Sequence, residues 1–315
     1  MTKYRDQLPQ LTGKLCLTDG GIETTLIFHE GLDLPEFAAF DLLKHAAGRA
    51  ALQKYFRTYA ALAQAYEVGF ILESATWRAN PDWGQKLGYS AGELADANRA
   101  AIDLLRGIRD QYETENTPMV ISGCIGPRGD GYNPTAIMSA DQAQHYHQIQ
   151  IEVFKHSGAD MVTAITMNYV EEAIGIARAA KLAGMPAAIS FTVETDGKLP
   201  TGQTLQEAIE IVDEATGSAP AYYMINCAHP RHFEDALAAG EPWIERIYGL
   251  RANASTKSHA ELNESAELDQ GDPVELGREH RQLMGKLKNL CVLGGCCGTD
   301  HRHIEEIFKA CTALA

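Results

Sequence analysis

Three cysteine residues have the side-chain type and the setting for metal chemistry. Cys227 ends the segment YYMINC, and Cys296 and Cys297 follow the apolar, glycine-rich segment VLGG. Thiolate sulfur is a preferred ligand of zinc. Cys227 lies too far from the other two for a zinc finger, so a shared site needs a fold that brings both segments together. The alternative is that the adjacent cysteines are simply buried beside a glycine-rich turn.

The chemistry of such a centre follows from its ligands. Three cysteines without an obvious fourth protein ligand would leave one zinc position open, as in catalytic zinc sites. Three thiolates give the centre a net negative charge, which suits holding a fourth thiol as thiolate better than activating water. The pattern therefore favours alkylation of a small thiol over hydrolysis. His229, His301 and His303 are rival ligands, although each fits the start of a following helix better.

The segments that must position these cysteines alternate between short apolar runs and longer helical patterns rich in alanine. Near-continuous apolar runs are typical of parallel strands covered on both faces. Eight such units predict a single α/β domain, residues 1–315, folded as a (β/α)8 TIM barrel with the zinc site at the carboxyl-terminal rim of its strands. The dinucleotide-binding pattern GxGxxG is absent after the first run, which disfavours an open doubly wound sheet.

The expected elements can be given by residue number. Strands are expected at residues 15–21, 69–76, 119–126, 160–166, 187–193, 221–227, 244–251 and 291–295. Helices are expected at residues 50–67, 91–112, 140–157, 170–183, 204–215, 230–239, 273–287 and 301–311. Two long loops, 76–90 and 253–272, follow the second and seventh strands, where a barrel builds its active site. The second loop is polar and acidic, so we interpret it as a solvated loop or lid.

The composition disfavours nucleic acids and membranes as binding partners. The formal net charge is −15, whereas binding to nucleic acid or to an anionic membrane needs clustered Lys and Arg. No apolar stretch approaches the ~20 residues that span a bilayer, and the first residues lack the apolar core of a signal peptide. Seven cysteines, an odd number, do not indicate a disulfide framework. We expect a cytoplasmic protein without nucleic-acid or membrane partners, and its oligomeric state does not follow from the sequence.

Four motifs carry a resemblance to a known family. They are LTDGGIET, SGCIGPRGDGY, INCAHP and LGGCCGT, in this order along the chain. Together they resemble the zinc-dependent homocysteine S-methyltransferases, which include the betaine– and S-methylmethionine–homocysteine enzymes. The resemblance runs from about residue 15 to residue 303. It implies a (β/α)8 barrel, Zn²⁺ on Cys227, Cys296 and Cys297, homocysteine as the methyl acceptor and methionine as the product.

Acceptor recognition departs from the family pattern. The resemblance places Asp19 near the homocysteine amino group, although an aspartate before two glycines also suits a turn. It places Ile165 where relatives carry a glutamate, and an isoleucine cannot accept hydrogen bonds from an ammonium group. Glu73, where relatives more often carry Thr or Gln, is our candidate for the missing carboxylate, with a purely structural glutamate as the alternative.

Aromatic and amide side chains complete the candidate substrate site. Trp77, Trp83 and Tyr89 in the first long loop would either form a cage for a sulfonium or quaternary ammonium donor or anchor the loop. Asn226, beside the first cysteine, would either orient the site or stabilise the strand end. The residues expected to bind substrate are Asp19, Glu73, Asn226, Thr166 and Trp77.

The combined prediction is a zinc-dependent S-methyltransferase whose partners are a small thiol acceptor and a methyl donor. The zinc-bound thiolate displaces the leaving group of the donor, so no general base is needed. S-methylmethionine or S-adenosylmethionine suits a chain of this size, with betaine or another methylamine as the next choice. The change at Ile165 also permits another small thiol as acceptor. A zinc hydrolase and a non-catalytic zinc and thiol-binding barrel are the alternatives from other classes.

Overall fold

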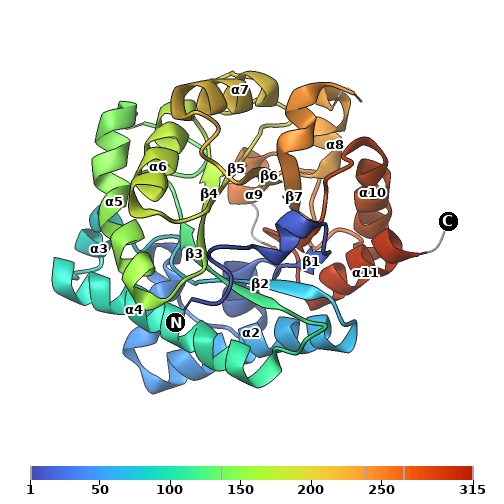
Figure 1. Ribbon diagram of the computed structural model, residues 1–315. Helices are drawn as coiled ribbons and strands as arrows, with labels where there is room; N and C mark the ends of the chain where they lie inside the picture. The colour runs from blue at the N-terminus through green and yellow to red at the C-terminus, as the bar shows by residue number, and fades with distance from the viewer. Residues whose placement is uncertain (1, 136, 238–239, 265–266, 314–315) are drawn as a thin grey trace.

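The chain folds into a closed barrel of eight parallel strands, which confirms the (β/α)8 prediction (Figure 1). The computed structural model describes residues 2–135, 137–237, 240–264 and 267–313. Each strand pairs with the next along the chain, and β8 closes the barrel against β1. The strands are β1 (Cys16–Leu17), β2 (Gly69–Glu73), β3 (Met119–Ile125), β4 (Met161–Met167), β5 (Ala187–Phe191), β6 (Tyr222–Asn226), β7 (Ile247–Ala252) and β8 (Val292–Gly295).

Helices surround the barrel on the outside (Figure 1). The helices that cover successive strands are α2 (Ala46–Ala65), α4 (Ala91–Tyr112), α5 (Ala140–Ser157), α6 (Val170–Ala183), α7 (Leu205–Thr216), α8 (Pro230–Phe233), α10 (Pro273–Lys286) and α11 (His301–Thr312). Loops after the strands hold α1 (Ile22–Thr24), α3 (Pro81–Lys86) and α9 (His259–Asn263). Short 3₁₀ or π turns cover Pro9–Thr12, Thr25–His29, Pro35–Phe37, Ala39–Lys44, Glu234–Ala236 and Pro242–Arg246. Within the described ranges, no helix is both long enough and apolar enough to cross a bilayer.

Several elements are shorter than the sequence predicts, and the differences are largest for the first strand and for the helix after β6. The first strand ends at Leu17, although the Thr18 N–H still donates to the Leu293 carbonyl at 2.8 Å, because the chain then turns into α1. The helix expected over 230–239 is the single turn α8 followed by a 3₁₀ turn, because the backbone of Phe233 leaves the helical region. Residues 238 and 239 of that prediction lie outside the described residues.

Capping residues explain where several helices begin and end. Ser90, Ser139 and Thr204 each cap a helix by accepting a hydrogen bond from the backbone three residues later, where a Glu or Gln side chain returns the bond. α5 and α7 end at Gly158 and Gly217, whose positive φ angles glycine adopts at little steric cost. These local signals fix the boundaries independently of the barrel.

The interior of the barrel is apolar at one end and polar at the other. The apolar end is a buried cluster that includes Ile71, Val120, Met161 and Tyr222. Because side chains alternate along a strand, the residues two positions further on each strand face the same interior. On β2, β3 and β4 these residues are polar: Glu73, Ser122 and Thr163 form a layer in which the Ser122 and Thr163 hydroxyls lie 2.7 Å apart, whereas Met224 at the corresponding position of β6 is apolar. This polar layer faces the carboxyl-terminal rim.

Asp160 joins several segments at the opposite, amino-terminal end of the barrel. One carboxylate oxygen accepts hydrogen bonds from Arg109 of α4 at 2.8 Å and from the Ile121 N–H of β3 at 3.0 Å. The other oxygen accepts from the backbone N–H groups of Lys3 and Tyr4 at 2.7 and 3.0 Å. Asp160 is fully buried, so its charge neutralises a buried guanidinium while it anchors the amino-terminal segment.

We expect Asp160→Ala to lower the free energy of unfolding by about 3–5 kcal/mol, because it leaves the Arg109 charge buried and unpaired. Urea denaturation followed by circular dichroism measures the change. Glu30→Ala is the matched control, since the Glu30–Lys54 pair is largely exposed and such pairs contribute ~0–1 kcal/mol. Equal effects of the two substitutions would contradict the assignment of Asp160 as a structural anchor.

Candidate metal centre and substrate cavity

Strand β7 positions the cysteines of both neighbouring strands. The N–H of Cys227, after β6, donates to the Arg251 carbonyl at 3.1 Å, and the N–H of Cys296, after β8, donates to the Ala252 carbonyl at 2.8 Å. The sulfur atoms of Cys227, Cys296 and Cys297 consequently lie within 4.8 Å of one another. The barrel therefore brings the three cysteines together at its carboxyl-terminal rim, and their role as metal ligands stays a prediction.

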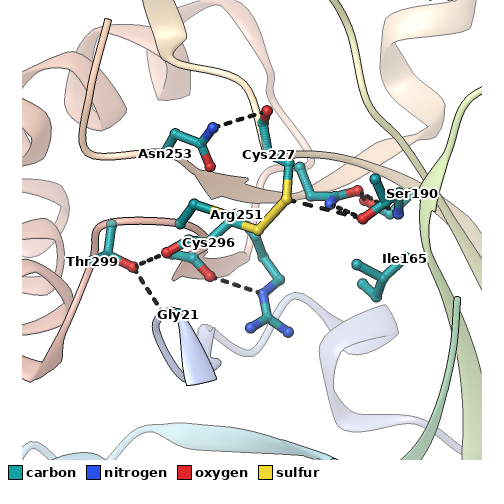
Figure 2. The surroundings of a disulfide bond; sticks show 12 residues. Gly21, Ile165, Ser190, Cys227, Arg251, Asn253, Cys296 and Thr299 are labelled. Carbon is teal, nitrogen blue, oxygen red and sulfur yellow. Dashed lines mark hydrogen bonds between the residues drawn. A yellow bond between two sulfur atoms is a disulfide. The ribbon is translucent and has the colours of Figure 1, made fainter. Parts of the chain in front are cut away.

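Two of the three sulfur atoms are bonded to each other in this structure. A disulfide joins Cys227 and Cys296, whose Cα atoms are 5.4 Å apart, whereas Cys297 is a free thiol (Figure 2). We did not predict this bond from the sequence, because we assigned all three thiols to a zinc ion. All three sulfurs become available as thiolates only after two-electron reduction of the disulfide.

The adjacent residues Cys296 and Cys297 reach one centre because the backbone turns after β8. The Cys296 carbonyl accepts hydrogen bonds from the Thr299 N–H at 3.2 Å and from the Thr299 hydroxyl at 2.7 Å (Figure 2). Gly298 within this turn has a φ of +79°, a conformation that favours glycine. The turn supplies the change of direction that a regular strand does not allow.

Unusual backbone conformations surround Cys227. Cys227 and Thr166 both have positive φ angles, +54° and +66°, which are uncommon for residues other than glycine. The Asn253 side chain donates to the Cys227 carbonyl at 3.0 Å, and His259 contacts the same oxygen. The Thr166 hydroxyl lies 3.9 Å from the Cys227 sulfur. Local strain of this kind persists where surrounding contacts over-determine the position, often at functional sites.

Asn226 holds these two strained residues in place. Its side-chain oxygen accepts hydrogen bonds from the Thr166 N–H at 3.0 Å and from the Ser190 hydroxyl at 2.6 Å. Its side-chain nitrogen donates to the Thr166 hydroxyl at 3.0 Å. Asn226 is fully buried and does not line the cavity. These contacts correspond to the orienting alternative, and substrate binding by Asn226 stays a prediction.

A cavity of about 780 Å³ opens beside the sulfur cluster. The side chains of Asp19, Glu73, Thr166 and Trp77, expected to bind substrate, all line it, as does Ile165. Ile165, near the end of β4, has an apolar side chain, so β4 offers no carboxylate to this cavity. Acidic residues instead come from β2 and from the turn after β1.

Arg251 and Asp19 form a buried ion pair on the floor of the cavity. The Arg251 guanidinium lies 2.5 Å from one Asp19 oxygen, and the Tyr55 hydroxyl donates to the other at 2.9 Å. Arg251 also donates to the Gly295 carbonyl at 3.1 Å (Figure 2). The charge of Asp19 is thus already balanced within the protein. We did not single out Arg251 from the sequence, although a lone arginine in an apolar parallel strand is the signal that identifies it.

Glu73 is the second carboxylate on this floor, and it lacks such a partner. Its side chain is 5% exposed, and no described residue makes a hydrogen bond with its Oε2 atom. Burial raises the pKa of Glu73 to about 7, against the opposing effect of the positive charge on Arg251. An uncompensated buried carboxyl group is costly when ionised, so Glu73 takes up either a proton or a cation.

The aromatic side chains of the first long loop do not form an open cage. The Arg78 guanidinium stacks 4.3 Å from the Trp77 ring and 3.7 Å from the Trp83 ring. Tyr89 packs against Phe40 and does not line the cavity. The hypothesis of a three-ring donor cage is therefore wrong, because a cation of the protein already occupies two of the rings and the third lies elsewhere.

Two further residues near the sulfurs escaped the sequence analysis. The Tyr132 hydroxyl lies 3.8 Å from the Cys297 sulfur, and its ring packs 4.0 Å from the His259 ring. Tyr132 belongs to the motif SGCIGPRGDGY, and His259 begins α9 in the loop that we interpreted as solvated. The rival histidines lie elsewhere: His229 caps α8, and His303 bonds to Asp300 at the start of α11.

Comparison with known proteins agrees with this architecture. The sequence profile described as homocysteine S-methyltransferase matches residues 16–311. Betaine–homocysteine S-methyltransferase 1 from Rattus norvegicus is 24% identical over 262 residues, which cover 76% of this chain and 60% of that protein. The Bos taurus protein of the same name is 22% identical over the same shares. The chain therefore spans about 60% of the length of these curated relatives.

Solved structures of the homocysteine methyltransferase MmuM from Escherichia coli share the fold. The oxidised form superposes with a TM-score of 0.73 at 17% identity, covering 93% of this chain and 95% of that one. The metallated form superposes with a TM-score of 0.72 at 18% identity, covering 97% and 98%. With a matching profile over nearly its full length, the chain belongs to the homocysteine S-methyltransferase family.

Proposed function

We propose that this protein transfers a methyl group from a small cationic donor to the sulfur of homocysteine, giving methionine. The observation that carries the proposal is the meeting of three cysteine sulfurs within 4.8 Å beside a cavity. Its volume, about 780 Å³, lies in the range of ordinary small-molecule sites. Membership of the family indicates the type of reaction, and the side chains that line the cavity indicate which substrates fit.

The three sulfurs fit a soft divalent cation such as Zn²⁺ once the disulfide is reduced. Cys227, Cys296 and Cys297 would hold it, and the described residues add no histidine or carboxylate to this cluster. When bound, the metal supplies a positive charge that keeps a nearby thiol deprotonated at neutral pH. A set of three thiolates also agrees better with thiol alkylation than with hydrolysis, which relies on nitrogen and oxygen ligands.

The protein contributes mainly by holding two reactants in line. The acceptor sulfur forms a bond to the methyl carbon while the bond from that carbon to the donor heteroatom breaks. The bonding electron pair leaves with the donor, which loses its positive charge, and the thiol proton passes to solvent. Orientation of the reactants within a cavity shielded from water lowers the barrier to such a displacement.

The charge of the cavity favours a cationic donor. Two guanidinium groups, those of Arg78 and Arg251, lie among eight carboxyl groups in the described lining. The eight acidic residues are Asp19, Glu23, Glu36, Glu73, Asp130, Glu194, Glu267 and Asp269. An acidic cavity attracts positive ligands and repels anions. S-methylmethionine and S-adenosylmethionine, which carry sulfonium groups, are therefore our preferred donors, and betaine is the next choice.

Glu73 is the group that we assign to the ammonium of the acceptor. Asp19 already bonds to Arg251 and Tyr55, and Ile165 is apolar. Glu73 has an unpartnered oxygen and lines the cavity. An ammonium group bound there would replace the proton that this carboxyl group otherwise retains near neutral pH. Thr166, which lines the cavity 3.9 Å from the Cys227 sulfur, and Trp77, through Arg78, complete the substrate contacts.

After reduction and zinc loading, we expect the protein to form methionine from homocysteine with S-methylmethionine or S-adenosylmethionine. Cys297→Ala removes one sulfur, so zinc bound per chain and methyl transfer should fall together to background. Metal analysis and chromatographic detection of methionine measure the two quantities. Cys311→Ala, which removes a core thiol of α11 outside the site, should keep both. Zinc binding without transfer from any donor in the panel, betaine included, would instead indicate a binding protein.

We expect Glu73→Gln to reduce kcat/KM for homocysteine about 10- to 100-fold, since it removes a hydrogen bond between charged groups. The same substitution should change kcat/KM for 4-mercaptobutanoate less than about threefold, because this thiol lacks the ammonium group. Steady-state kinetics with both acceptors measures the ratio. Glu171→Gln, an exposed position on α6, is the control for loss of a negative charge. An equal loss with both acceptors would remove Glu73 from ammonium binding.

Glu73 should also make the stability of the ligand-free protein depend on pH. The pKa of its carboxyl group is about 7 in the folded protein against 4.5 unfolded, so the folded state binds the proton more tightly and loses stability as pH rises through this window. Relative to Glu73→Gln, we expect the wild-type free energy of unfolding to fall by about 2–3 kcal/mol between pH 5 and 8. Parallel urea titrations test this, and a constant difference would contradict it.

A further inference from the structure

Arg78 is a buried cation in the wall of the cavity. It lies between β2 and α3 and is 8% exposed. The Trp77 and Trp83 rings stack against its guanidinium at 4.3 and 3.7 Å. Stacking on two indoles fixes the plane of the guanidinium without using its N–H groups. The residue therefore presents a preoriented fork of donors.

Most of these donors have no acceptor among the described residues. The Nη1 atom donates to the Gly129 carbonyl at 3.1 Å. Across the described ranges, neither Nη2 nor Nε makes a hydrogen bond, and no carboxylate forms an ion pair with Arg78. Arg128 on a neighbouring loop behaves differently: it stacks on Tyr146 and also pairs with Asp82 at 2.8 Å. Of these two arginines, only Arg78 has a charge that no carboxylate of the described residues neutralises. Its guanidinium is therefore available to a ligand.

An unpaired buried guanidinium is unfavourable, and a carboxylate is the ligand that relieves it best. Burial lowers the pKa of Arg78, and the more distant charges of Asp130, Glu23 and Glu36 oppose this shift without forming hydrogen bonds to it. A carboxylate can accept two parallel hydrogen bonds from a guanidinium, which adds directionality to the charge attraction. Arg78 thus fits an amino-acid carboxylate entering the cavity.

The surroundings of Arg78 differ from those of Glu73. Glu73 is the last residue of β2 and pairs in register with Ser122 of β3, whereas Arg78 lies in the following loop, bonded to the Gly129 carbonyl and stacked on Trp83. The carboxylate of the acceptor is attached to the same carbon as its ammonium group, so an acceptor anchored at Glu73 keeps its carboxylate near the floor. The wall around Arg78 therefore remains for the second reactant.

We propose that Arg78 binds the carboxylate of the methyl donor and thereby selects donors that are amino acids. This inference rests on the proposed methyl transfer and adds the recognition of the donor. The acidic residues Glu23 and Glu36, whose charges act on Arg78 from a greater distance, also line the cavity and favour the cationic groups of such a donor. Trp77 and Trp83 contribute by holding the guanidinium rather than by caging the donor cation.

The experiment compares two donors that differ only in the carboxylate. S-methylmethionine carries it, and (3-aminopropyl)dimethylsulfonium keeps the sulfonium and ammonium groups without it. We expect Arg78→Met to lower kcat/KM for S-methylmethionine about 10- to 100-fold and to leave the second donor within about threefold. Arg78→Lys, which keeps the charge and loses the fork, should fall between. Arg128→Met is the matched control, and circular dichroism verifies that each variant is folded.

Further measurements separate failure of this inference from failure of the proposed reaction. Calorimetric titration of the zinc-loaded protein with each sulfonium ion reports binding without turnover, and wild type should bind S-methylmethionine at least tenfold more tightly. Equal binding of both ions by the wild type, or unchanged binding by Arg78→Met, would overturn the inference whether or not methyl transfer occurs. Steady-state kinetics is also measured with two acceptors, homocysteine and 3-mercaptopropylamine, which differ only in the carboxylate. If Arg78→Met raises KM selectively for homocysteine, the carboxylate belongs to the acceptor and our assignment to the donor is wrong.

Discussion

The three sulfur atoms meet because consecutive carbonyl groups of one strand hold the cysteines of two others. Arg251 and Ala252 of β7 accept hydrogen bonds from Cys227 on one side and from Cys296 on the other. This arrangement requires β6, β7 and β8 to pair side by side, as successive strands of the sheet do. The site is therefore a property of the sheet backbone, and the Asn226 side chain fixes the backbone of Thr166 beside it. Distortion of β7 would disperse the cluster even if all three cysteines remained.

The same strand carries the charge on which the cavity floor depends. Arg251 points into the barrel from β7 and neutralises Asp19 after β1. A buried ion pair contributes little net stability, because the cost of removing both charges from water offsets their attraction. The ion pair matters here because it neutralises Asp19. Among the described residues, Glu73 is then the carboxylate on the cavity floor that has no cation bonded to it. The arrangement leaves Asp19 as a structural group and Glu73 as the group that we propose for ligand binding.

The sequence predicts the fold and the cysteine cluster, but it does not predict the side-chain contacts that line the cavity, for physical reasons. Apolar runs and capping boxes at Ser90, Ser139 and Thr204 are local signals, so strand and helix positions follow from them directly. The cysteine cluster follows from the order of the strands in a barrel. The Arg251–Asp19 pair depends on which side chains face each other across the barrel, and the stacking of Arg78 on Trp77 and Trp83 depends on the path of one loop; the apolar periodicity encodes neither. Aromatic residues near a cation site therefore suggested a ligand cage, although the cation that they bind belongs to the protein.

A methyltransferase of this kind must distinguish two substrates that carry the same amino-acid groups. Both homocysteine and S-methylmethionine have an ammonium and a carboxylate, so a cavity with a single binding subsite would let each exclude the other. In this chain the unpaired charges are of opposite sign and lie in different surroundings: Glu73 on the floor and Arg78 on the wall. On the proposed assignment, one reactant would be anchored by its ammonium and the other by its carboxylate, which would orient the two amino acids differently while their sulfur atoms face each other. Separation of the two unpaired charges thus determines where each substrate binds as well as how tightly it binds. Positioning of this kind is the main contribution that a protein makes to a direct methyl transfer.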